Sequence, residues 1–292
     1  MSEKHPVIAV TGSSGAGTST VKKAFEHIFH REGINAGIVE GDSFHSYDRA
    51  GMKKAFDEFT QQGKTLSHFG PEANLFDKLE ELFKTYGEKG QAKVRRYLHD
   101  EEEAAPYKQE PGTFTQWEDV PKDSDILFYE GLHGGVSDEK AGIDVSKYVD
   151  LLIGVVPIVN LEWIQKIHRD TAERGYSAEA VTHTILRRMH DYVHFVTPQF
   201  SKTHINFQRV PTVDTSNPFI ARDIPTPDES FVVIRFKNPK TVDFPHLLSM
   251  MHDSFMSRPN TLVVPGGKMG FAMEIILTPI IHDMIEKKRK AK

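Results

Sequence analysis

The chain has 292 residues, enough for one sizeable α/β domain or two small ones, and 38% hydrophobic and 26% charged residues are ordinary for a globular protein. A formal net charge of −5 gives no basic field, so we expect no nucleic-acid partner. The absence of cysteine excludes disulfides, thiolate metal sites and thiol redox switches. We expect a cytoplasmic protein without a membrane segment, because the longest apolar run, residues 151–159, is far shorter than the roughly 20 residues of a span and no signal peptide is recognisable.

A glycine-rich segment follows the first apolar run, residues 7–10, and precedes a helical pattern. It matches the phosphate-loop template G-x-x-x-x-G-K-[ST] at both glycines and at Ser19, but Thr18 replaces the lysine. Glycines let successive N–H groups point at one anion, and the following helix adds its positive end. We therefore expect a phosphate site in which Ser19 binds Mg²⁺ and another cation supplies the missing charge; a plain tight turn is the alternative. The predicted phosphate-binding residues are Gly12, Ser13, Ser14, Gly15, Ala16, Gly17, Thr18, Ser19 and Thr20.

The next two elements carry the first candidate catalytic residues. Apolar residues recur with the helical period over residues 20–32, and Gly33 ends that helix. A strand over residues 36–39 follows, and Asp42 and His45 project from its carboxyl edge. Ligands of open α/β sheets bind at this edge, so we expect both side chains to lie near a substrate.

Residues 46–122 are polar and irregular, which predicts an insertion or lid region. Short helical patterns occur at residues 52–62 and 72–86, and residues 68–71 are typical of a turn. The acidic run at residues 100–103 is interpreted as a solvated surface.

Two buried strands are predicted after the insertion. Residues 126–131 form an apolar strand that ends in Glu130, which could hold Mg²⁺ through water; a simple strand-end turn is the alternative. Residues 151–156 form an uninterrupted apolar run, typical of a central strand covered on both faces. Four strands with intervening helices predict a doubly wound α/β sheet.

A helix over residues 161–173, with Asn160 as its N-cap, groups charged side chains on one face. At about 100° per residue, the face carries three cations around one carboxylate, which suits phosphate binding. An exposed helix laced with i,i+4 ion pairs is the alternative. The four residues are Lys166, Arg169, Asp170 and Arg174.

Ser177 is predicted to cap the next helix, whose apolar residues are spaced four apart. Arg187 and Arg188 point away from that apolar face and are either phosphate clamps or surface charge. Strands over residues 205–213, 231–236 and 261–264 and a last helix over 269–287 are expected to complete the sheet, so that residues 197–292 belong to the same single domain as the rest. The apolar residues of the Ser177 helix are Val181, Ile185, Met189 and Val193.

Together these features predict phosphoryl transfer, in which positioning and charge neutralisation supply most of the catalysis. Asp42 is placed to take a proton from an attacking hydroxyl, and His45 and Arg49 follow it on the same segment. This pattern indicates an anionic acceptor that carries a hydroxyl group. The residues alone therefore predict a small-molecule kinase.

At these residues the sequence resembles the proteobacterial, class I phosphoribulokinases, over essentially the whole chain. The matching motifs are residues 12–20, 40–45, 128–134, 160–170 and 207–219. The resemblance implies a doubly wound mixed sheet of the P-loop nucleoside and sugar kinase type with inserted lid segments. The family also lacks the loop lysine, so Lys166 or a nearby arginine is implied as the replacement charge.

The resemblance further implies that ATP phosphorylates the C1 hydroxyl of D-ribulose 5-phosphate, giving ribulose 1,5-bisphosphate for the Calvin cycle. It implies activation by NADH, inhibition by AMP and a large homo-oligomer, a hexamer or octamer. Ordinary surface arginine is the alternative for the residues assigned to an effector. The implied assignments are Asp42 as base, Lys166 and Asp170 as catalytic, Ser19 and Glu130 for Mg²⁺, His45, Arg49, Arg169, Arg174 and Arg187 for the substrate, and Arg31, Arg188, Arg235 and Arg258 for effectors.

Two other functions remain open. A related kinase could act on another pentose or on a nucleoside, because a P-loop fold does not fix its substrate. A nucleotide-sensing regulatory protein could retain the fold without turnover, although the presence of Ser19, Asp42 and Glu130 speaks against it.

Overall fold

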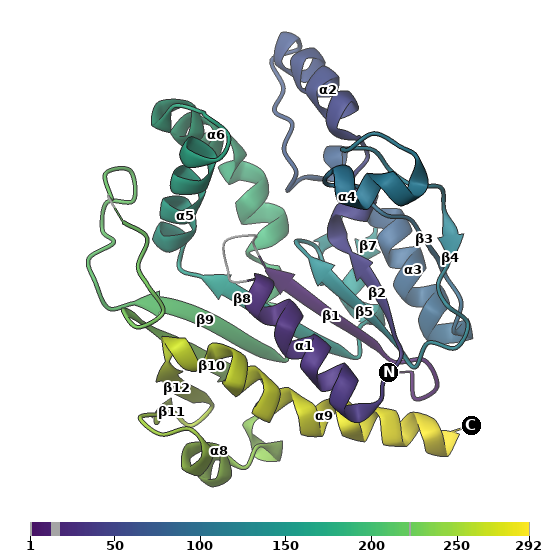
Figure 1. The fold of residues 1–292 in the computed structure, drawn as a ribbon, viewed down its shortest axis with the longest axis vertical. Coiled ribbons are helices and arrows are strands. Elements are labelled where there is room, and N and C mark those ends of the chain that lie inside the picture. The colour runs from purple at the N-terminus through teal and green to yellow at the C-terminus, as the bar shows by residue number, and fades with distance from the viewer. Residues whose placement is uncertain (1, 13–17, 222, 292) are drawn as a thin grey trace.

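The computed structural model describes residues 2–12, 18–221 and 223–291. Its centre is an eight-stranded sheet with the order β11-β12-β10-β9-β8-β1-β5-β2 (Figure 1). The strands from β2 to β9 in this order pair in parallel, and β10, β12 and β11 pair antiparallel, so the sheet is mixed as predicted. The strands are β1 (Val7–Gly12), β2 (Ala36–Glu40), β5 (Ile126–Gly131), β8 (Leu151–Pro157), β9 (Ile205–Pro211), β10 (Ser230–Phe236), β11 (Phe255–Arg258) and β12 (Thr261–Pro265).

Helices cover both faces of the sheet. On one face, α1 (Thr18–Glu32) lies beside α9 (Met269–Ala291), and α8 (Phe244–Met250) covers the antiparallel end (Figure 1). The rings of Phe25 in α1 and Phe128 in β5 pack there with centroids 4.4 Å apart. On the other face, α3 (Phe76–Lys89) packs on the sheet, and Phe83 contacts Tyr129 with ring centroids 5.4 Å apart. The predicted doubly wound α/β arrangement is confirmed.

The remaining elements are short or lie at one edge of the sheet. Figure 1 shows α2, α5 and α6 standing beyond the carboxyl ends of the parallel strands. Within the predicted insertion, residues 46–122, α2 projects in this way, whereas α3 is a core helix. These elements are α2 (Arg49–Gln61), α4 (Glu101–Ala104), α5 (Val159–Ala172), α6 (Ala178–Asp191), α7 (Gln199–Lys202), β3 (Lys93–Val94), β4 (Glu118–Asp119), β6 (Ser137–Asp138) and β7 (Ile143–Asp144).

The predicted start of α5 is wrong. The helix begins at Val159 with Ile158 in the N-cap position, two residues before the expected cap. Asn160 lies inside the helix, and its Nδ2 donates a hydrogen bond of 2.9 Å to the carbonyl of Thr215. Asn160 therefore contacts the distant loop that carries Thr215 and does not cap the helix. In contrast, Ser177 does cap α6, because its Oγ accepts from the backbone N–H of Ala180.

The apolar pattern of α6 is right at its start and wrong at its end. Val181 and Ile185 are buried, but Val193 is 50% exposed. The chain turns into a π-helix over Tyr192–Val196, which adds a residue to the turn and rotates the following side chains. Tyr192 and Val196 are consequently the buried residues of this segment. Among the described residues, no helix has both the length and the apolar character to cross a membrane.

Candidate active site

The predicted phosphate site begins where β1 ends. Gly12 pairs with Val155 of β8, and a Cβ atom at Gly12 would lie 2.1 Å from the Val155 carbonyl oxygen, so only glycine fits. The predictions for Ser13, Ser14, Gly15, Ala16 and Gly17, and for the side chains of Thr18 and Ser19, fall outside the residues that the structure describes. α1 begins at Thr18, so its positive end lies beside the carboxyl edge of β1.

Two glycines bring the ends of β2 and β5 together. A Cβ atom at Gly41 would lie 2.9 Å from the Cα of Gly131, and one at Gly131 would lie 2.7 Å from the Cα of Gly41. Either substitution would also meet the Tyr129 hydroxyl at 2.6 Å. This close approach gathers Asp42, which follows β2, and Glu130, which ends β5, at one edge of the sheet.

The carboxyl group of Glu130, at this edge, has a strongly raised pKa. Burial, together with the negative charges of Glu40 and Asp42, raises the pKa of Glu130 to about 7, against the opposing charge of Lys22. A divalent cation here would favour the ionised carboxylate. The described residues contain no group of three acidic or histidine side chains able to hold a metal, but Mg²⁺ commonly uses one or two carboxylates with phosphate oxygens and waters. Glu130 fits that role.

Two histidines lie beside the Asp42 carboxylate. The Nε2 atom of His45 is 3.7 Å from Oδ1 of Asp42, and the Nε2 atom of His99 is 3.9 Å from Oδ2. Burial, opposed by Asp42 and assisted by His99 and Arg95, lowers the pKa of His45. Arg49 at the start of α2 donates from Nη2 to the carbonyl of His99 at 2.9 Å, which joins Arg49 to this group.

Arg95 holds the backbone around Asp42. Its Nε donates to the carbonyl of Ser43 at 2.8 Å, and its Nη2 donates to the carbonyl of His45 at 2.6 Å. The guanidinium carbon also lies 3.7 Å from the centroid of the Phe114 ring. Because Ser43 lies within the η1 turn (Gly41–Phe44) that contains Asp42 and His45 directly follows it, Arg95 restrains the backbone just after Asp42.

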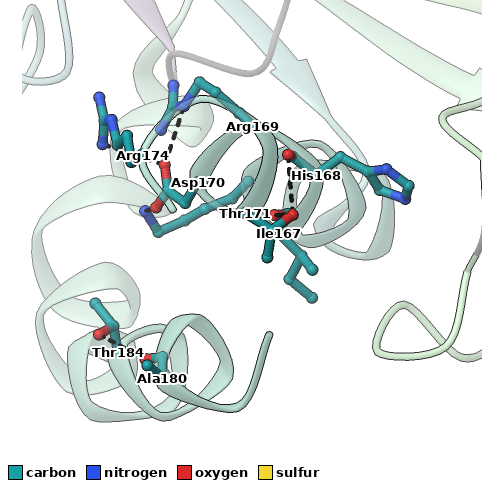
Figure 2. A network of polar contacts seen from close by, with 9 residues as sticks. Ile167, His168, Arg169, Asp170, Thr171, Arg174, Ala180 and Thr184 are labelled. Atoms are coloured by element: carbon teal, nitrogen blue, oxygen red, sulfur yellow. Dashed lines mark hydrogen bonds and ion pairs between the residues drawn. The ribbon is translucent and has the colours of Figure 1, made fainter. Parts of the chain in front are cut away.

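Asp170 of α5, whose exposed fraction is 4%, is surrounded by Lys166 and Arg169 of the same helix and by Arg174, which follows the helix; Figure 2 labels the two arginines. Lys166 Nζ lies 2.5 Å from Oδ2, and Oδ1 accepts from Arg169 Nε at 3.2 Å and from Arg174 Nη1 at 3.1 Å. Burial raises the pKa of Asp170, but the hydrogen bond from Lys166 and the three positive charges outweigh it and leave this pKa below its ordinary value. The predicted grouping of these four residues is therefore present, around a carboxylate that stays ionised.

His68 connects the two groups. Its ring centroid lies 4.9 Å from that of His45. Burial, followed by the charges of His45, Arg188 and Lys166, lowers the pKa of His68 to about 3. Arg188 is thus a neighbour of this site, and burial lowers its own pKa to about 10.

Arg187 takes a different direction from Arg188. Its guanidinium carbon lies 4.2 Å from the centroid of the Phe56 ring, so it links α6 to α2 rather than to the four charged residues of α5. The Nε atoms of Arg187 and Arg188 are both buried and have no hydrogen-bond partner among the described residues.

His68, Arg95 and His99 were not predicted as site residues from the sequence, and Arg188 was expected among the effector arginines. His68 lies in a segment predicted only as a turn, and Arg95 and His99 lie in the irregular part of the predicted insertion. Contacts between loops that are far apart in the sequence determine the positions of these side chains, so no periodic pattern in the sequence indicates them. A basic or histidine side chain within the predicted lid was the only available signal.

The other three arginines predicted to bind an effector lie in α1, β10 and β11. In α1, Arg31 donates from Nη2 to the Thr278 hydroxyl at 2.5 Å and lies 3.6 Å from Glu274, both in α9. Arg235 in β10 and Arg258 in β11 pair with the same residue of β12, Thr261, from its two sides. Arg31 therefore contacts α9, whereas the other two lie on strands that flank β12.

The family profile described as "Phosphoribulokinase / Uridine kinase family" matches residues 7–216. The chain is 63% identical over 292 residues to the chromosomal phosphoribulokinase of Cupriavidus necator, covering 100% of this chain and 99% of that protein. It is 59% identical over 292 residues to the phosphoribulokinase of Nitrobacter vulgaris, covering 100% of both. The chain belongs to the phosphoribulokinase family.

A solved structure agrees with this membership. The chain superposes on phosphoribulokinase from Rhodobacter spheroides with a TM-score of 0.90 and 56% sequence identity, covering 99% of this chain and 100% of that one. The predicted family, the P-loop kinase fold and the class of enzyme, an ATP-using kinase, are confirmed.

Proposed function

We propose that the chain transfers the γ-phosphoryl group of ATP to the C1 hydroxyl of D-ribulose 5-phosphate and so produces ribulose 1,5-bisphosphate for the Calvin cycle. Full-length similarity to phosphoribulokinases supports this activity. The observation that supports the mechanism is that the packed rings of His45 and His68 link the Asp42 carboxylate to the charged residues around Asp170. Asp42 with its histidines lies on one side, and the charged residues of α5 lie on the other.

On the nucleotide side, residues 12–20 and the positive end of α1 bind the phosphates of ATP. Ser19 and Glu130 hold Mg²⁺, which would supply charge neutralisation to the phosphate oxygens when bound. Lys166 provides the positive charge that Thr18 cannot. Burial and the neighbouring arginines lower the pKa of Lys166, although the hydrogen bond to Asp170 opposes this, so Asp170 keeps the ammonium charged and directed.

On the acceptor side, Asp42 takes the proton of the C1 hydroxyl as that oxygen attacks the γ-phosphorus. His45 and Arg49 bind the sugar phosphate beside Asp42, and Arg169, Arg174 and Arg187 provide cationic contacts from α5 and α6. Asp170 orients its cations and does not act as the base, since its pKa is held low. We assign Arg188 to this charged surface instead of the effector site, because its charge lowers the pKa values of His68 and Lys166.

Regulation and assembly follow the family resemblance. We propose a homo-oligomer, a hexamer or octamer, that NADH activates and AMP inhibits at a site between subunits. Arg31, Arg235 and Arg258 would bind an effector phosphate there, with Arg31 and the other two contributed by different subunits. If Arg31→Ala, Arg235→Ala and Arg258→Ala all keep the full NADH response, this effector site is wrong.

Substrate comparison separates the proposal from its rivals. ADP release should be measured with ATP, Mg²⁺ and one of D-ribulose 5-phosphate, ribose 5-phosphate or uridine. Turnover with D-ribulose 5-phosphate alone supports the proposal, and preferred turnover with either other compound indicates the related kinase. Nucleotide binding without ADP release from any of the three indicates the regulatory protein.

A further inference from the structure

The backbone around His68 is fixed from three directions. The Ser67 hydroxyl donates to Oδ2 of Asp191, at the end of α6, over 2.6 Å. The Asn74 amide donates to the carbonyl of His68 at 2.9 Å, and Nε2 of His133 lies 3.2 Å from the carbonyl oxygen of Phe69. Asn74 and His133 are themselves buried. The position of the His68 side chain is therefore determined by contacts with other elements and not by its own turn.

The His68 ring itself makes little use of its polar atoms. Its Nδ1 atom is buried and has no hydrogen-bond partner in the part of the chain that the structure describes. A buried polar nitrogen without a partner costs free energy, and such groups usually have a reason in ligand binding or water. The ring packs against that of His45, which lies beside Asp42, and the positive charges of Lys166 and Arg188 act on it.

The charge around His68 selects the kind of group that it can bind. Burial and the cations keep the imidazole neutral, because they lower its pKa to about 3. A neutral imidazole offers one N–H donor and one acceptor nitrogen, which suits a hydroxyl group better than a phosphate. The phosphate is attracted instead to the neighbouring ammonium and guanidinium groups.

We propose that His68 hydrogen-bonds an internal hydroxyl of the acceptor, at C3 or C4 of the pentulose phosphate, and is a specificity-determining residue. This inference rests on the proposed function, in which the acceptor reaches from Asp42 at its C1 end toward the cations of α5 and α6. Because the His68 ring packs on that of His45 beside Asp42, and the cations Lys166 and Arg188 act on it, this proposal assigns it to the middle of the sugar. The fixed backbone of residues 67–70 then makes the hydrogen bond selective for the position of that hydroxyl.

The test compares His68→Leu, His68→Asn and the wild type on three acceptors: D-ribulose 5-phosphate, its 3-deoxy analogue and its 4-deoxy analogue. Steady-state kinetics give kcat/KM for each acceptor and KM for ATP. His183→Leu, at an exposed position of α6, is the matched control for loss of a histidine. Thermal unfolding of each variant reports whether the fold survives.

The wild type should discriminate against one deoxy analogue by about 10- to 100-fold, as expected when a buried polar group loses its partner. His68→Leu should lower kcat/KM for D-ribulose 5-phosphate by a similar factor and lose that discrimination, with KM for ATP unchanged. His68→Asn keeps a polar atom and should recover part of both. His183→Leu should behave as the wild type.

The inference is overturned if His68→Leu keeps the wild-type discrimination against both analogues. It is also overturned if both His68 variants lose activity toward all acceptors equally and raise KM for ATP, which indicates a structural role. Failure of the wild type to phosphorylate D-ribulose 5-phosphate would instead refute the proposed function itself.

Discussion

The carboxylates of Asp42 and Asp170 differ sharply in exposure: the side chain of Asp42 is 46% exposed, whereas that of Asp170 is 6% exposed. Asp42 has only histidines within ion-pair distance, at 3.7 Å and 3.9 Å among the described residues. Asp170 is shared by Lys166 and two arginines. An acceptor hydroxyl can reach the first carboxylate, while the second is committed to the cations that surround it.

Asp42→Asn should therefore lower kcat by about 10²–10⁴, the usual cost of losing a general base. KM for ATP should change little, because Asp42 is assigned to the acceptor hydroxyl and not to ATP. Asp170→Asn should also lower activity but should shift the Mg²⁺ dependence. Retention of more than about a tenth of wild-type kcat by Asp42→Asn, or a Mg²⁺ shift in Asp42→Asn rather than Asp170→Asn, contradicts this division of roles.

Arg95→Ala should lower kcat by about 10- to 100-fold, because a small displacement of a catalytic group has effects of this size. The variant loses the hydrogen bonds to the carbonyls of Ser43 and His45 that fix the segment carrying Asp42. The matched control is Arg96→Ala, since the Arg96 side chain is 68% exposed and its ion pair with Glu118 is long, at 3.9 Å. Equal kcat values for the two variants would show that Arg95 does not position Asp42.

The Lys166–Asp170 pair should show strong coupling in a double-mutant cycle measured by urea unfolding. We expect Lys166→Met and Asp170→Asn to interact by about 1–3 kcal/mol, since Asp170 is buried and the atoms are 2.5 Å apart. The exposed i,i+4 pair Lys54–Glu58, at 3.9 Å, is the control and should couple by less than about 0.5 kcal/mol. Similar coupling energies for both pairs would contradict the buried network.

Glu130→Gln should change how stability depends on pH. Because the pKa of Glu130 rises from 4.5 to about 7 on folding, the folded state binds more protons than the unfolded state between these values. Its contribution to stability therefore falls as pH rises through this window. Relative to the wild type, the variant should gain stability between pH 5 and pH 8, by the order of 1 kcal/mol after allowing for solvent at the half-buried carboxyl.

Thermal unfolding of both proteins in the absence of nucleotide measures this difference at each pH. The comparison at pH 5, where the wild-type carboxyl is protonated, serves as the internal control. A stability difference that is the same at pH 5 and pH 8 would show that Glu130 ionises at its ordinary pKa.

Much of the fold could be predicted because its signals are local. The apolar runs at β1, β5 and β8 are continuous, and such strands are buried whatever their neighbours. Boundaries that depend on distant contacts could not be predicted. Asn160 is an ordinary capping residue by type, but the carbonyl of Thr215, remote in the sequence, accepts its amide. Likewise, nothing in the apolar spacing of α6 announced the π-helix at Tyr192–Val196.

The residues of the candidate site also fall into those that local patterns indicate and those that distant contacts position. Asp42 follows β2 and Glu130 lies at the end of the neighbouring β5. Lys166, Arg169, Asp170 and Arg174 recur with the helical period, so local patterns were sufficient for all of these residues. His68, Arg95 and His99 come from irregular segments. Their positions depend on how residues 62–75 and 90–118 fold back on the sheet edge, which no periodicity encodes.

The most direct measurement of the central claim is identification of the phosphorylated position. D-ribulose 5-phosphate labelled with ¹³C at C1 should be incubated with ATP, Mg²⁺ and the protein, and the product examined by ³¹P and ¹³C NMR, with Asp42→Asn as the control. The account predicts a second phosphate ester coupled to the labelled C1 carbon, formed with one ADP per product and nearly absent with Asp42→Asn. ADP formation without a phosphate on C1, or an equal rate with Asp42→Asn, would contradict it.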